Sequence, residues 1–467
     1  MRKTRIICTL GPVSESSEII EKLILAGTDA FRLNMSHAKH EWVREIVPRV
    51  RAIARKNNRS VGILLDTQGP AIRTGVLEKD LQLAVGDTLE ITVGGAKATE
   101  PNSITVNYDG LIDDVSVGDV VLLDNGLMQV RVQEKEDGRI RTTVLTAGAL
   151  GSRRHLNLPG VHVNLPALTE KDLADVALGI ELKLDFVALS FARKKEDLDQ
   201  LRRVLRKGGG SALVVAKIES ASAVKDLDKM IRAADVVLVA RGDLGIECPM
   251  EDLPIIQRRI VKRCLRIGKP VIVATQMLES MIENPLPTRA EVTDVANAVF
   301  EQADAIMLTG ETTSGRYPVE CVEVLDRIAR RIERSGGAGY GKDALLEDAR
   351  QKTVAAAVTL ADSLHHPRIV VFTRHGTMAR YVSNLRPGHA PIFAFTPNEV
   401  VYRQLSISWG VFPVLLQFTD DPNATIEAAE KNLRAAEWIQ PNDNLVVLSD
   451  VRAGDDLIDC VQLRHVN

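Results

Sequence analysis

The sequence is poor in cysteine and in aromatic residues, and it has no long hydrophobic run. No stretch stays apolar over the roughly 20 residues that a membrane-spanning helix needs, and the apolar part of the opening MRKTRIICTLGP is too short for a signal peptide. The net charge is only −3, so neither a nucleic acid nor a membrane is an expected partner. The five cysteines include no Cys-x-x-Cys pair and are typical of reduced thiols, which predicts a cytoplasmic protein.

Hydrophobic residues make up 45% of the 467 positions, which is enough for large globular cores. At roughly 150 residues per domain, a chain of this length is expected to form about three domains. Three zones differ in composition. The first is split into residues 1–69 and 166–335, the second is 70–165, and the third, 345–467, follows the glycine-rich break SGGAG at 335–339.

The split zone alternates short apolar strands with amphipathic helical patterns such as 16–26 and 41–56. Eight strands are predicted, at residues 5–10, 29–34, 61–66, 186–190, 212–217, 236–240, 270–275 and 305–309. Eight βα units over about 240 residues are typical of an α/β TIM barrel. A doubly wound sheet is the alternative, but the lack of a G-x-G-x-x-G nucleotide motif favours closure into a barrel.

Residues 70–165 interrupt this pattern between the third strand and its helix. The zone is rich in Val, Thr, Gly and Asp, and alternating segments such as LEITV and QVRV lie between Gly-Asp, Asn-Gly and Asp-Gly turn signals. We therefore expect an all-β insertion. Because it enters at the catalytic end of a strand, it is expected to act as a lid rather than as a decoration.

Residues 345–467 are predicted to form a smaller α/β domain with strands at 368–373, 391–396, 411–416 and 444–449. The last run, 456–466, has no helix before it and should join the sheet antiparallel. The segment Thr373-Arg374-His375-Gly376-Thr377 follows a strand and opens a helix, where backbone N–H groups and hydroxyls can hold a phosphate. An ordinary capped turn is the alternative to this predicted site for a phosphorylated effector.

Polar residues follow nearly every predicted barrel strand, and in parallel sheets these strand ends carry the chemistry. The stretch 212–245 is the clearest case: one strand ends in Lys217 and Glu219, and the next in Arg241 and Asp243. All four side chains are expected to emerge at the same end. Glu219 and Asp243 are hard oxygen ligands suited to Mg²⁺, and Lys217 would face the anion that the metal holds.

The other rim residues extend this chemistry. Arg32 and Arg73 offer bidentate donors for phosphate or carboxylate. Neutral and single-charge oxygens suited to a weakly bound cation come from Asn34, Ser36, Asp66 and Thr67. His37 is the only rim histidine, and a purely structural role is equally open to it. Phosphoryl transfer fits this mixture best, because it demands positioning and charge neutralisation.

A series of motifs resembles the pyruvate kinase family. In family order and spacing they are ICTLGP, FRLNMSH, LDTQGPAIRTG, LNLPG, LPALTEKD, KIES, ARGDLGIE, ATQMLESM, PTRAEVTDVANAV and MLTGETTSGRYP, over residues 3 to 330. The C-terminal domain resembles the family's in layout and less closely in sequence. The resemblance implies a TIM barrel with an inserted β-barrel lid, a C-terminal effector domain and usually a homotetramer. It also implies transfer of phosphate from phosphoenolpyruvate to ADP, giving pyruvate and ATP in the last step of glycolysis.

The resemblance further implies roles for individual residues. Lys217 matches the lysine that neutralises the migrating phosphoryl group, and Glu219 and Asp243 match the ligands of Mg²⁺ (or Mn²⁺). The phosphoenolpyruvate site would be lined by Gly242, Asp243 and Thr275 at the carboxylate and Arg32 at the phosphoryl group. Positions near the nucleotide phosphates are Asn34, Ser36, His37, Arg73 and Arg154, and a K⁺ site would use Asn34, Ser36, Asp66 and Thr67. Water on the Thr275 side, with Glu311 nearby, would protonate the enolate.

Three positions depart from the family. Arg154 stands where lysine is frequent, which keeps the charge, and Gln68 and Ala71 differ from both common patterns. Members that need K⁺ resemble a pattern with Thr at position 67 and Glu at 71, while independent members tend to carry Leu and Lys. This chain has Thr67 and Ala71. Because Ala71 brings no positive charge to offset Asp66 beside anionic substrates, activation by K⁺ is expected.

Two other functions are open to the same residues. A Mg²⁺-dependent aldolase or lyase acting on a pyruvate enolate would share the acidic metal pair, but Lys217 and the arginines near the nucleotide speak against it. A catalytically silent metabolite sensor belongs to another class. The intact set of Lys217, Glu219, Asp243 and Thr275 makes that reading the weaker one.

Overall fold

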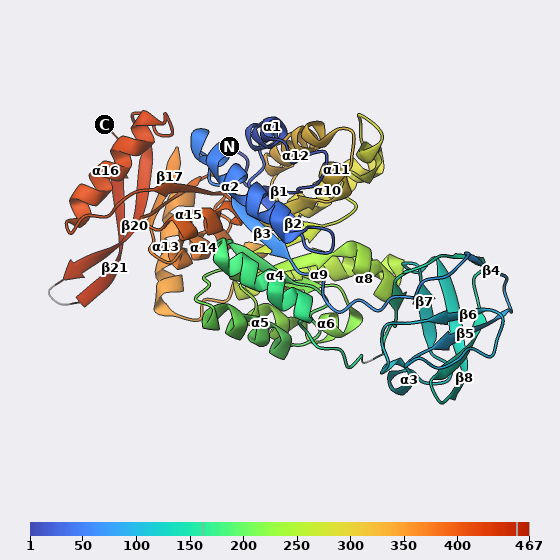
Figure 1. The fold of residues 1–467 in the computed structure, drawn as a ribbon. Helices are drawn as coiled ribbons and strands as arrows, with labels where there is room; N and C mark the ends of the chain where they lie inside the picture. The colour runs from blue at the N-terminus through green and yellow to red at the C-terminus, as the bar shows by residue number, and fades with distance from the viewer. Residues whose placement is uncertain (162, 454–455, 467) are drawn as a thin grey trace.

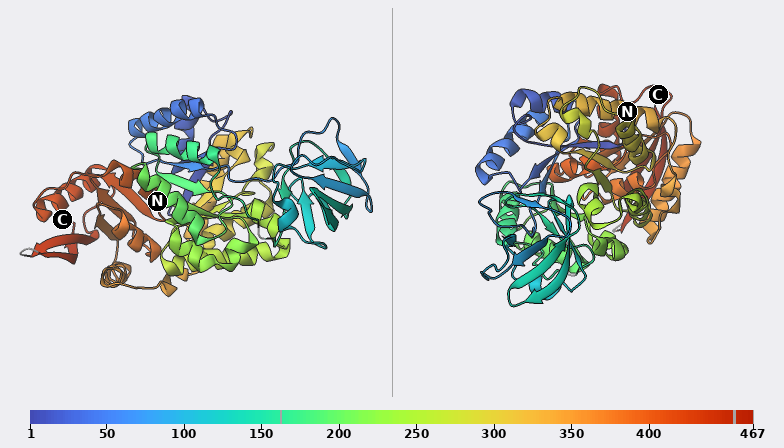
Figure 2. Two further views of the ribbon diagram at one scale, coloured as in Figure 1. Left: turned by 60° about the horizontal axis from the view of Figure 1, so that its bottom comes forward. Right: turned by 90° about the vertical axis from the view of Figure 1, so that its right-hand side faces the viewer.

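The computed structural model describes residues 1–161, 163–453 and 456–466. Three bodies lie in a row, with the barrel in the middle (Figure 1). The inserted domain stands at one end of the barrel and the C-terminal domain at the other, an arrangement that the left view of Figure 2 repeats. Each of the three predicted zones therefore forms a body of its own, and the three bodies together make an elongated molecule.

The barrel consists of parallel strands in the closed order β1-β16-β15-β14-β13-β12-β3-β2. Their bounds are β1 Arg5–Thr9, β2 Ala30–Asn34, β3 Gly62–Asp66, β12 Phe186–Leu189, β13 Leu213–Ile218, β14 Val236–Ala240, β15 Val271–Ala274 and β16 Ala305–Leu308. Each predicted strand is confirmed with its ends within one residue. The apolar, β-branched runs form strands that are buried on both faces, as helices cover the outside of the barrel. The prediction of a TIM barrel is correct, and the doubly wound alternative is wrong.

Helices follow the barrel strands. They are α1 (Ser17–Ala26), α2 (His40–Lys56), α4 (Glu170–Glu181), α5 (Lys195–Lys207), α6 (Ala221–Lys225), α7 (Leu227–Ala233), α8 (Arg241–Glu247), α9 (Leu253–Ile267), α10 (Arg289–Phe300), α11 (Gly310–Thr313) and α12 (Pro318–Glu333). Side-chain caps fix several starts. Ser16 accepts the Ile19 N–H before α1, and Thr169 and Thr288 form capping boxes before α4 and α10. In the described part of the chain, no helix combines the length and the apolar character needed to cross a bilayer.

The inserted zone forms two sheets. A six-stranded sheet has the order β11-β7-β8-β9-β5-β6, and β10 pairs with β4 in a second. The bounds are β4 Leu81–Leu83, β5 Thr88–Thr92, β6 Ser103–Thr105, β7 Val120–Leu123, β8 Met128–Glu136, β9 Arg139–Val144, β10 Gly148–Leu150 and β11 Leu156–Asn157. The insertion is built mainly of strands, as predicted. Its described strands are divided between two sheets, and one short helix, α3 (Leu111–Asp114), lies between β6 and β7.

The C-terminal domain has a five-stranded sheet of order β19-β18-β17-β20-β21. The strands are β17 (Pro367–Phe372), β18 (Ile392–Thr396), β19 (Val411–Leu415), β20 (Asn444–Ala453) and β21 (Asp456–His465), and the helices are α13 (Ala349–Ser363), α14 (Thr377–Asn384), α15 (Glu399–Gln404) and α16 (Pro422–Ala435). As predicted, β21 pairs antiparallel with β20. It therefore forms an edge of the sheet.

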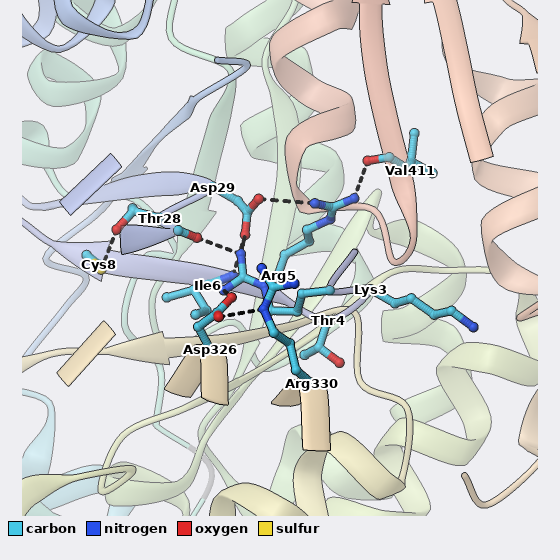
Figure 3. Close-up of polar contacts among 12 residues, drawn as sticks. Lys3, Thr4, Arg5, Ile6, Cys8, Thr28, Asp29, Asp326, Arg330 and Val411 are labelled. Carbon is cyan, nitrogen blue, oxygen red and sulfur yellow. Dashed lines mark hydrogen bonds and ion pairs between the residues drawn. The ribbon is translucent and has the colours of Figure 1, made fainter. Parts of the chain in front are cut away.

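Buried charges join the C-terminal domain to the barrel. Figure 3 shows Arg5 at the start of β1 reaching both Asp29 and the carbonyl of Val411. Arg386 donates to Asp304, directly before β16, at 2.7 Å, and both side chains are almost fully buried. Because these barrel residues lie at the amino ends of the strands, the C-terminal domain covers the end of the barrel opposite the polar rim.

Candidate active site

Lys217 stands at the centre of the polar rim. Its Nζ lies 2.6 Å from Oε1 of Glu219 and 3.2 Å from Oδ1 of Asp66, and it donates to Oγ of Ser190 at 2.8 Å. Burial alone would lower the pKa of Lys217, but the two carboxylates outweigh it and raise the pKa above its usual value. The side chain is therefore a fixed ammonium at the end of β13.

Arg32 and Lys217 share the carboxylate of Asp66. Arg32, near the end of β2, donates through Nε to Oδ2 of Asp66 at 2.7 Å and through Nη1 to Oγ1 of Thr9 at 3.2 Å. Burial would raise the pKa of Asp66, but Lys217 and Arg32 more than offset this and lower it. The two cations expected at the transferred phosphoryl group are thus brought together by one ionised carboxylate.

Glu219 and Asp243 form an acidic pair beside this cluster. Oε2 of Glu219 accepts the N–H of Phe191 at 2.6 Å, while Oε1, although close to Lys217, is buried without a hydrogen bond of good geometry. Burial, opposed by Lys217 and reinforced by Asp243, raises the pKa of Glu219 to about 7. An oxygen held only by an ammonium, next to a second carboxylate, is a setting that a divalent cation fits.

Only two carboxylates contribute to this candidate metal site. Within the described residues, no group of three or more His, Cys, Asp or Glu side chains is arranged to hold a metal ion. Mg²⁺ is commonly held by one or two carboxylates and completes its octahedron with water and substrate oxygens. The donor set therefore suits a metal that is shared with substrate.

The turn after β15 is held in an uncommon backbone conformation. Thr275 and Gln276 have φ angles of 69° and 54°, a region that costs non-glycine residues energy and is often found at functional sites. Oγ1 of Thr275 accepts the N–H of Gly242 at 2.8 Å, which ties this turn to the start of α8. The predicted carboxylate-binding residues Gly242 and Thr275 are thus adjacent.

Arg241 follows directly after β14, at the same end of the barrel as Lys217. It is buried and donates to the carbonyls of Ala274, Thr275 and Gln276, and it pairs with Asp294 at 2.7 Å. The guanidinium satisfies carbonyls that the sharp turn leaves without partners. Arg241 therefore supports the Thr275 turn.

A cavity of about 600 Å³ separates the barrel rim from the inserted domain. Glu219 and Asp243 line it from the barrel, and residues 155–158 line it from the inserted domain together with Ala71. The acidic pair thus opens into a space of ligand size, and the inserted domain forms one of its walls.

The remaining predicted residues are spread around this centre. Asn34 and Asp66 are register partners at the ends of β2 and β3, while Ser36 and His37 are exposed. Oγ1 of Thr67 donates to the carbonyl of Ala188 at 3.0 Å, so its hydroxyl is bonded to the neighbouring barrel strand β12. These positions surround Asp66 without converging on it.

The two predicted nucleotide cations of the inserted domain have partners in that domain. Arg73 donates to the carbonyl of Arg153 at 3.1 Å, and Arg154 lies 3.5 Å from Asp124. Neither is brought to the Lys217 cluster by these contacts.

Three further residues matter around this centre. Ser190 lies at the end of the predicted strand 186–190, and its hydrogen bonds to Asp66 and Lys217 make it part of the cluster. His155 lines the cavity, and burial, followed by Arg73, lowers its pKa. Glu311, expected near the proton donor, accepts N–H groups of Leu278 and Thr309 with its two oxygens and so caps the chain.

Comparison with known proteins agrees with this geometry. The profile "Pyruvate kinase, barrel domain" matches residues 1–322, and "Pyruvate kinase, alpha/beta domain" matches residues 351–461. The pyruvate kinase of Geobacillus stearothermophilus is 41% identical over 97% of this chain and 78% of its own length, and that of Sporosarcina psychrophila is 39% identical over 97% and 79%.

A solved structure gives the same result. The crystal structure of a pyruvate kinase from Cryptosporidium parvum superposes with a TM-score of 0.95 at 33% identity, covering 100% of this chain and 96% of that one. Both family profiles, the full-length relatives and the shared fold lead to one assignment. The chain belongs to the pyruvate kinase family of phosphotransferases.

Proposed function

We propose that the Lys217 cluster and the Glu219–Asp243 pair carry out the reaction of the family. Family membership gives that reaction as the transfer of the phosphoryl group of phosphoenolpyruvate to ADP, in glycolysis. The bond between phosphorus and the enol oxygen breaks, a bond to a β-phosphate oxygen of ADP forms, and the enolate takes a proton to become pyruvate. The observation that carries the proposal is the convergence of Arg32 and Lys217 on Asp66 beside an acidic pair.

Lys217 and Arg32 neutralise negative charge during the transfer. Both are fixed donors at a water-poor rim, so they need little reorganisation when charge moves from phosphate to enolate. Their shared partner Asp66 holds them a fixed distance apart before substrate arrives. Substrate phosphate then replaces the carboxylate as their partner.

Glu219 and Asp243 would hold Mg²⁺, with Mn²⁺ as a substitute. A bound divalent ion supplies Lewis-acid polarisation and neutralises phosphate charge. The position of Oε1 of Glu219, which the structure pairs only with Lys217, and the raised pKa of that carboxyl support this assignment. Gly242 and Thr275 are adjacent and would bind the carboxylate of phosphoenolpyruvate, with the substrate replacing the hydrogen bonds that their N–H and hydroxyl make to Thr275 and Ala274 in the free chain.

The nucleotide phosphates would approach from the side of the inserted domain, near Arg73, Arg154 and the segment Asn34 to His37. Closure of that domain would bring these cations toward the cavity, because their present partners are weak or exposed. The half-buried His155 lies on the same wall and offers a further polar contact.

A coupled assay tests the function directly. Pyruvate should be released from phosphoenolpyruvate only when ADP and Mg²⁺ are both present, and removal of Mg²⁺ by a chelator should abolish turnover. Pyruvate release without ADP would instead indicate a lyase or phosphatase.

We also expect a phosphorylated effector at the turn from Thr373 to Thr377. This turn lines a separate cavity of about 480 Å³, and Gly376, with φ of 78°, begins α14 while its N–H donates to Oγ1 of Thr373. Calorimetric titration with sugar mono- and bisphosphates and nucleotides tests this site. Binding that Thr373→Val leaves unchanged would contradict it.

A homotetramer is the expected assembly. Large apolar side chains of the barrel domain, Met250, Ile255 and Leu286 among them, are exposed, and β21 is an open sheet edge. Such features suit contacts between copies. Light scattering after gel filtration measures the assembly.

A cytoplasmic location accords with glycolysis and with the free thiols of the five cysteines.

A further inference from the structure

A basic cavity lies at the end of the barrel opposite the active site. It encloses about 520 Å³ between α2, the loops that lead into β3 and β12, and α15 of the C-terminal domain. Five cationic side chains line it, against the single acidic side chain of Glu399: Arg51, Arg55, Arg59, Lys183 and Arg403. We call this space the basal cavity. It is distinct both from the active site and from the cavity at the Thr373 turn.

The positive charge of the basal cavity is only partly neutralised. Arg403 pairs with the buried Asp185 at 2.8 Å and lies 3.7 Å from Glu399. Arg55, Arg59 and Lys183, in contrast, form no ion pair with any residue that the structure describes. Three cations are therefore left for a partner outside the chain.

Arg51 lies deeper and is held in place by the barrel. It donates to the carbonyls of Leu182 at 2.8 Å and Lys183 at 2.6 Å, while its Nε is buried without an acceptor. Burial lowers the pKa of Arg51, and Arg403 and Arg55 add to this effect against the opposing charge of Asp185. The cations therefore repel one another at close range, and a bound anion would reduce this repulsion.

Ordinary stabilisation of a helix end does not explain this arrangement. Cations in the last turn of a helix interact favourably with its dipole, and this accounts for Arg55 at the end of α2. Arg59 and Lys183 lie on loops, and Arg403 belongs to another domain. Their common feature is the space that they surround.

We propose that the basal cavity binds a small polyanion with at least two phosphate groups, which bridges the barrel and the C-terminal domain. Arginine guanidinium groups bind phosphate through paired N–H donors. Four of the cations stand on the barrel wall and Arg403 on the wall of the C-terminal domain, so a ligand with separated phosphates can contact both walls at once. The apolar side chains of Ala54, Val61 and Val400 border the same space and suit a compact ligand body.

Tripolyphosphate is a suitable probe, titrated calorimetrically without divalent metal at fixed ionic strength. The test variant is Arg55→Gln/Arg59→Gln/Lys183→Gln. The matched control is Arg203→Gln/Arg206→Gln/Lys207→Gln on the exposed end of α5, which removes the same charge away from the cavity. We expect binding to weaken at least tenfold in the test variant and less than twofold in the control. Equal affinities, or equal losses in both variants, would overturn the proposal.

Footprinting of the unaltered protein provides a second measurement that does not depend on the variants folding. Acetylation of lysines, read by mass spectrometry, should slow at Lys183 when tripolyphosphate is added and stay unchanged at Lys207. Both side chains are exposed, so their reaction without the probe gives the baseline. Equal rates at Lys183 with and without tripolyphosphate would refute binding there. Either result leaves phosphoryl transfer at the rim unaffected, because that site is tested by its own assay.

Discussion

Nζ of Lys217 lies 2.6 Å from Oε1 of Glu219, so the cation that we propose for the phosphoryl group and a carboxylate of the candidate metal site are direct neighbours. A divalent ion and the ammonium therefore compete for the same oxygen. When the metal takes it, Lys217 keeps Asp66 and Ser190 as partners and gains freedom to face substrate. In the ligand-free chain the ion pair therefore holds Lys217 and Glu219 side by side, where each can bind its proposed partner.

Lys217→Met should act on turnover more than on binding. The ammonium is most useful when negative charge migrates, so we expect kcat to fall by two or more orders of magnitude, roughly 3 kcal/mol or more of barrier. The KM for phosphoenolpyruvate should change only a few fold. Steady-state kinetics measure both. A fall in kcat of less than about tenfold would contradict the assignment.

Mg²⁺ binding to the free enzyme should strengthen as pH rises from 6 to 8. The pKa of Glu219 is raised to about 7, chiefly by burial, so below pH 7 a proton occupies the carboxyl and must leave before the metal binds. Above pH 7 that competition disappears. Metal titrations at several pH values measure the effect, with Glu219→Gln as the control that should bind weakly and lose the dependence. A pH-independent affinity would show that Glu219 is already ionised at pH 6, and an affinity that Glu219→Gln leaves unchanged would exclude Glu219 as a ligand.

The barrel was predictable because the sequence repeats one pattern eight times: a short apolar strand, polar residues at its end, and then an amphipathic helix. Local sequence also placed Lys217, Glu219 and Asp243 on one rim. It did not reveal that Arg241 turns inward, since the carbonyls that attract it follow another strand, β15. The direction of a charged side chain is decided by such distant partners.

The inserted domain illustrates the same limit. Its turns were evident, but α3 and the division of its strands into two sheets depend on pairings between distant segments, such as β10 with β4. Glu311 similarly looked like a candidate near the proton donor, and only the folded chain shows that backbone N–H groups occupy its oxygens. The kind of chemistry that the site supports could be predicted from the sequence, whereas the hydrogen-bond partner of each polar side chain could not.

Arg386→Ala should destabilise the contact between the barrel and the C-terminal domain. It would leave the buried carboxylate of Asp304 without its cation, a change that typically costs about 3–5 kcal/mol. The backbone N–H of the buried Trp409 donates to the same carboxylate at 3.2 Å, so the fluorescence of Trp409 during urea unfolding, measured in a Trp42→Phe/Trp438→Phe background, reports this interface. The control is Arg44→Ala, which breaks an exposed pair with Glu181 and should shift the transition little. Equal shifts would contradict the role given to Arg386.

The last prediction concerns K⁺. In the free chain Asp66 already has two cationic partners, Arg32 and Lys217, so a monovalent ion is not needed to neutralise it. That balance changes when a phosphoryl group draws both cations toward itself, because the charge of Asp66 then faces an anionic substrate in a partly dehydrated site. We therefore expect K⁺ to activate turnover while leaving the thermal stability of the substrate-free protein unchanged.

Position 71 offers the test of this reasoning. Ala71 lines the active-site cavity and carries no charge that could replace the ion. Ala71→Lys should make turnover less dependent on K⁺, whereas the uncharged Ala71→Met, of similar length, should keep the dependence. The measurement is turnover at fixed ionic strength with K⁺ exchanged for tetramethylammonium, which is too large for a cage of protein oxygens. If the rate of the unaltered enzyme is the same in both salts, protein groups such as Arg32 compensate Asp66 throughout the cycle, and the predicted cation site at Asn34, Ser36, Asp66 and Thr67 is wrong.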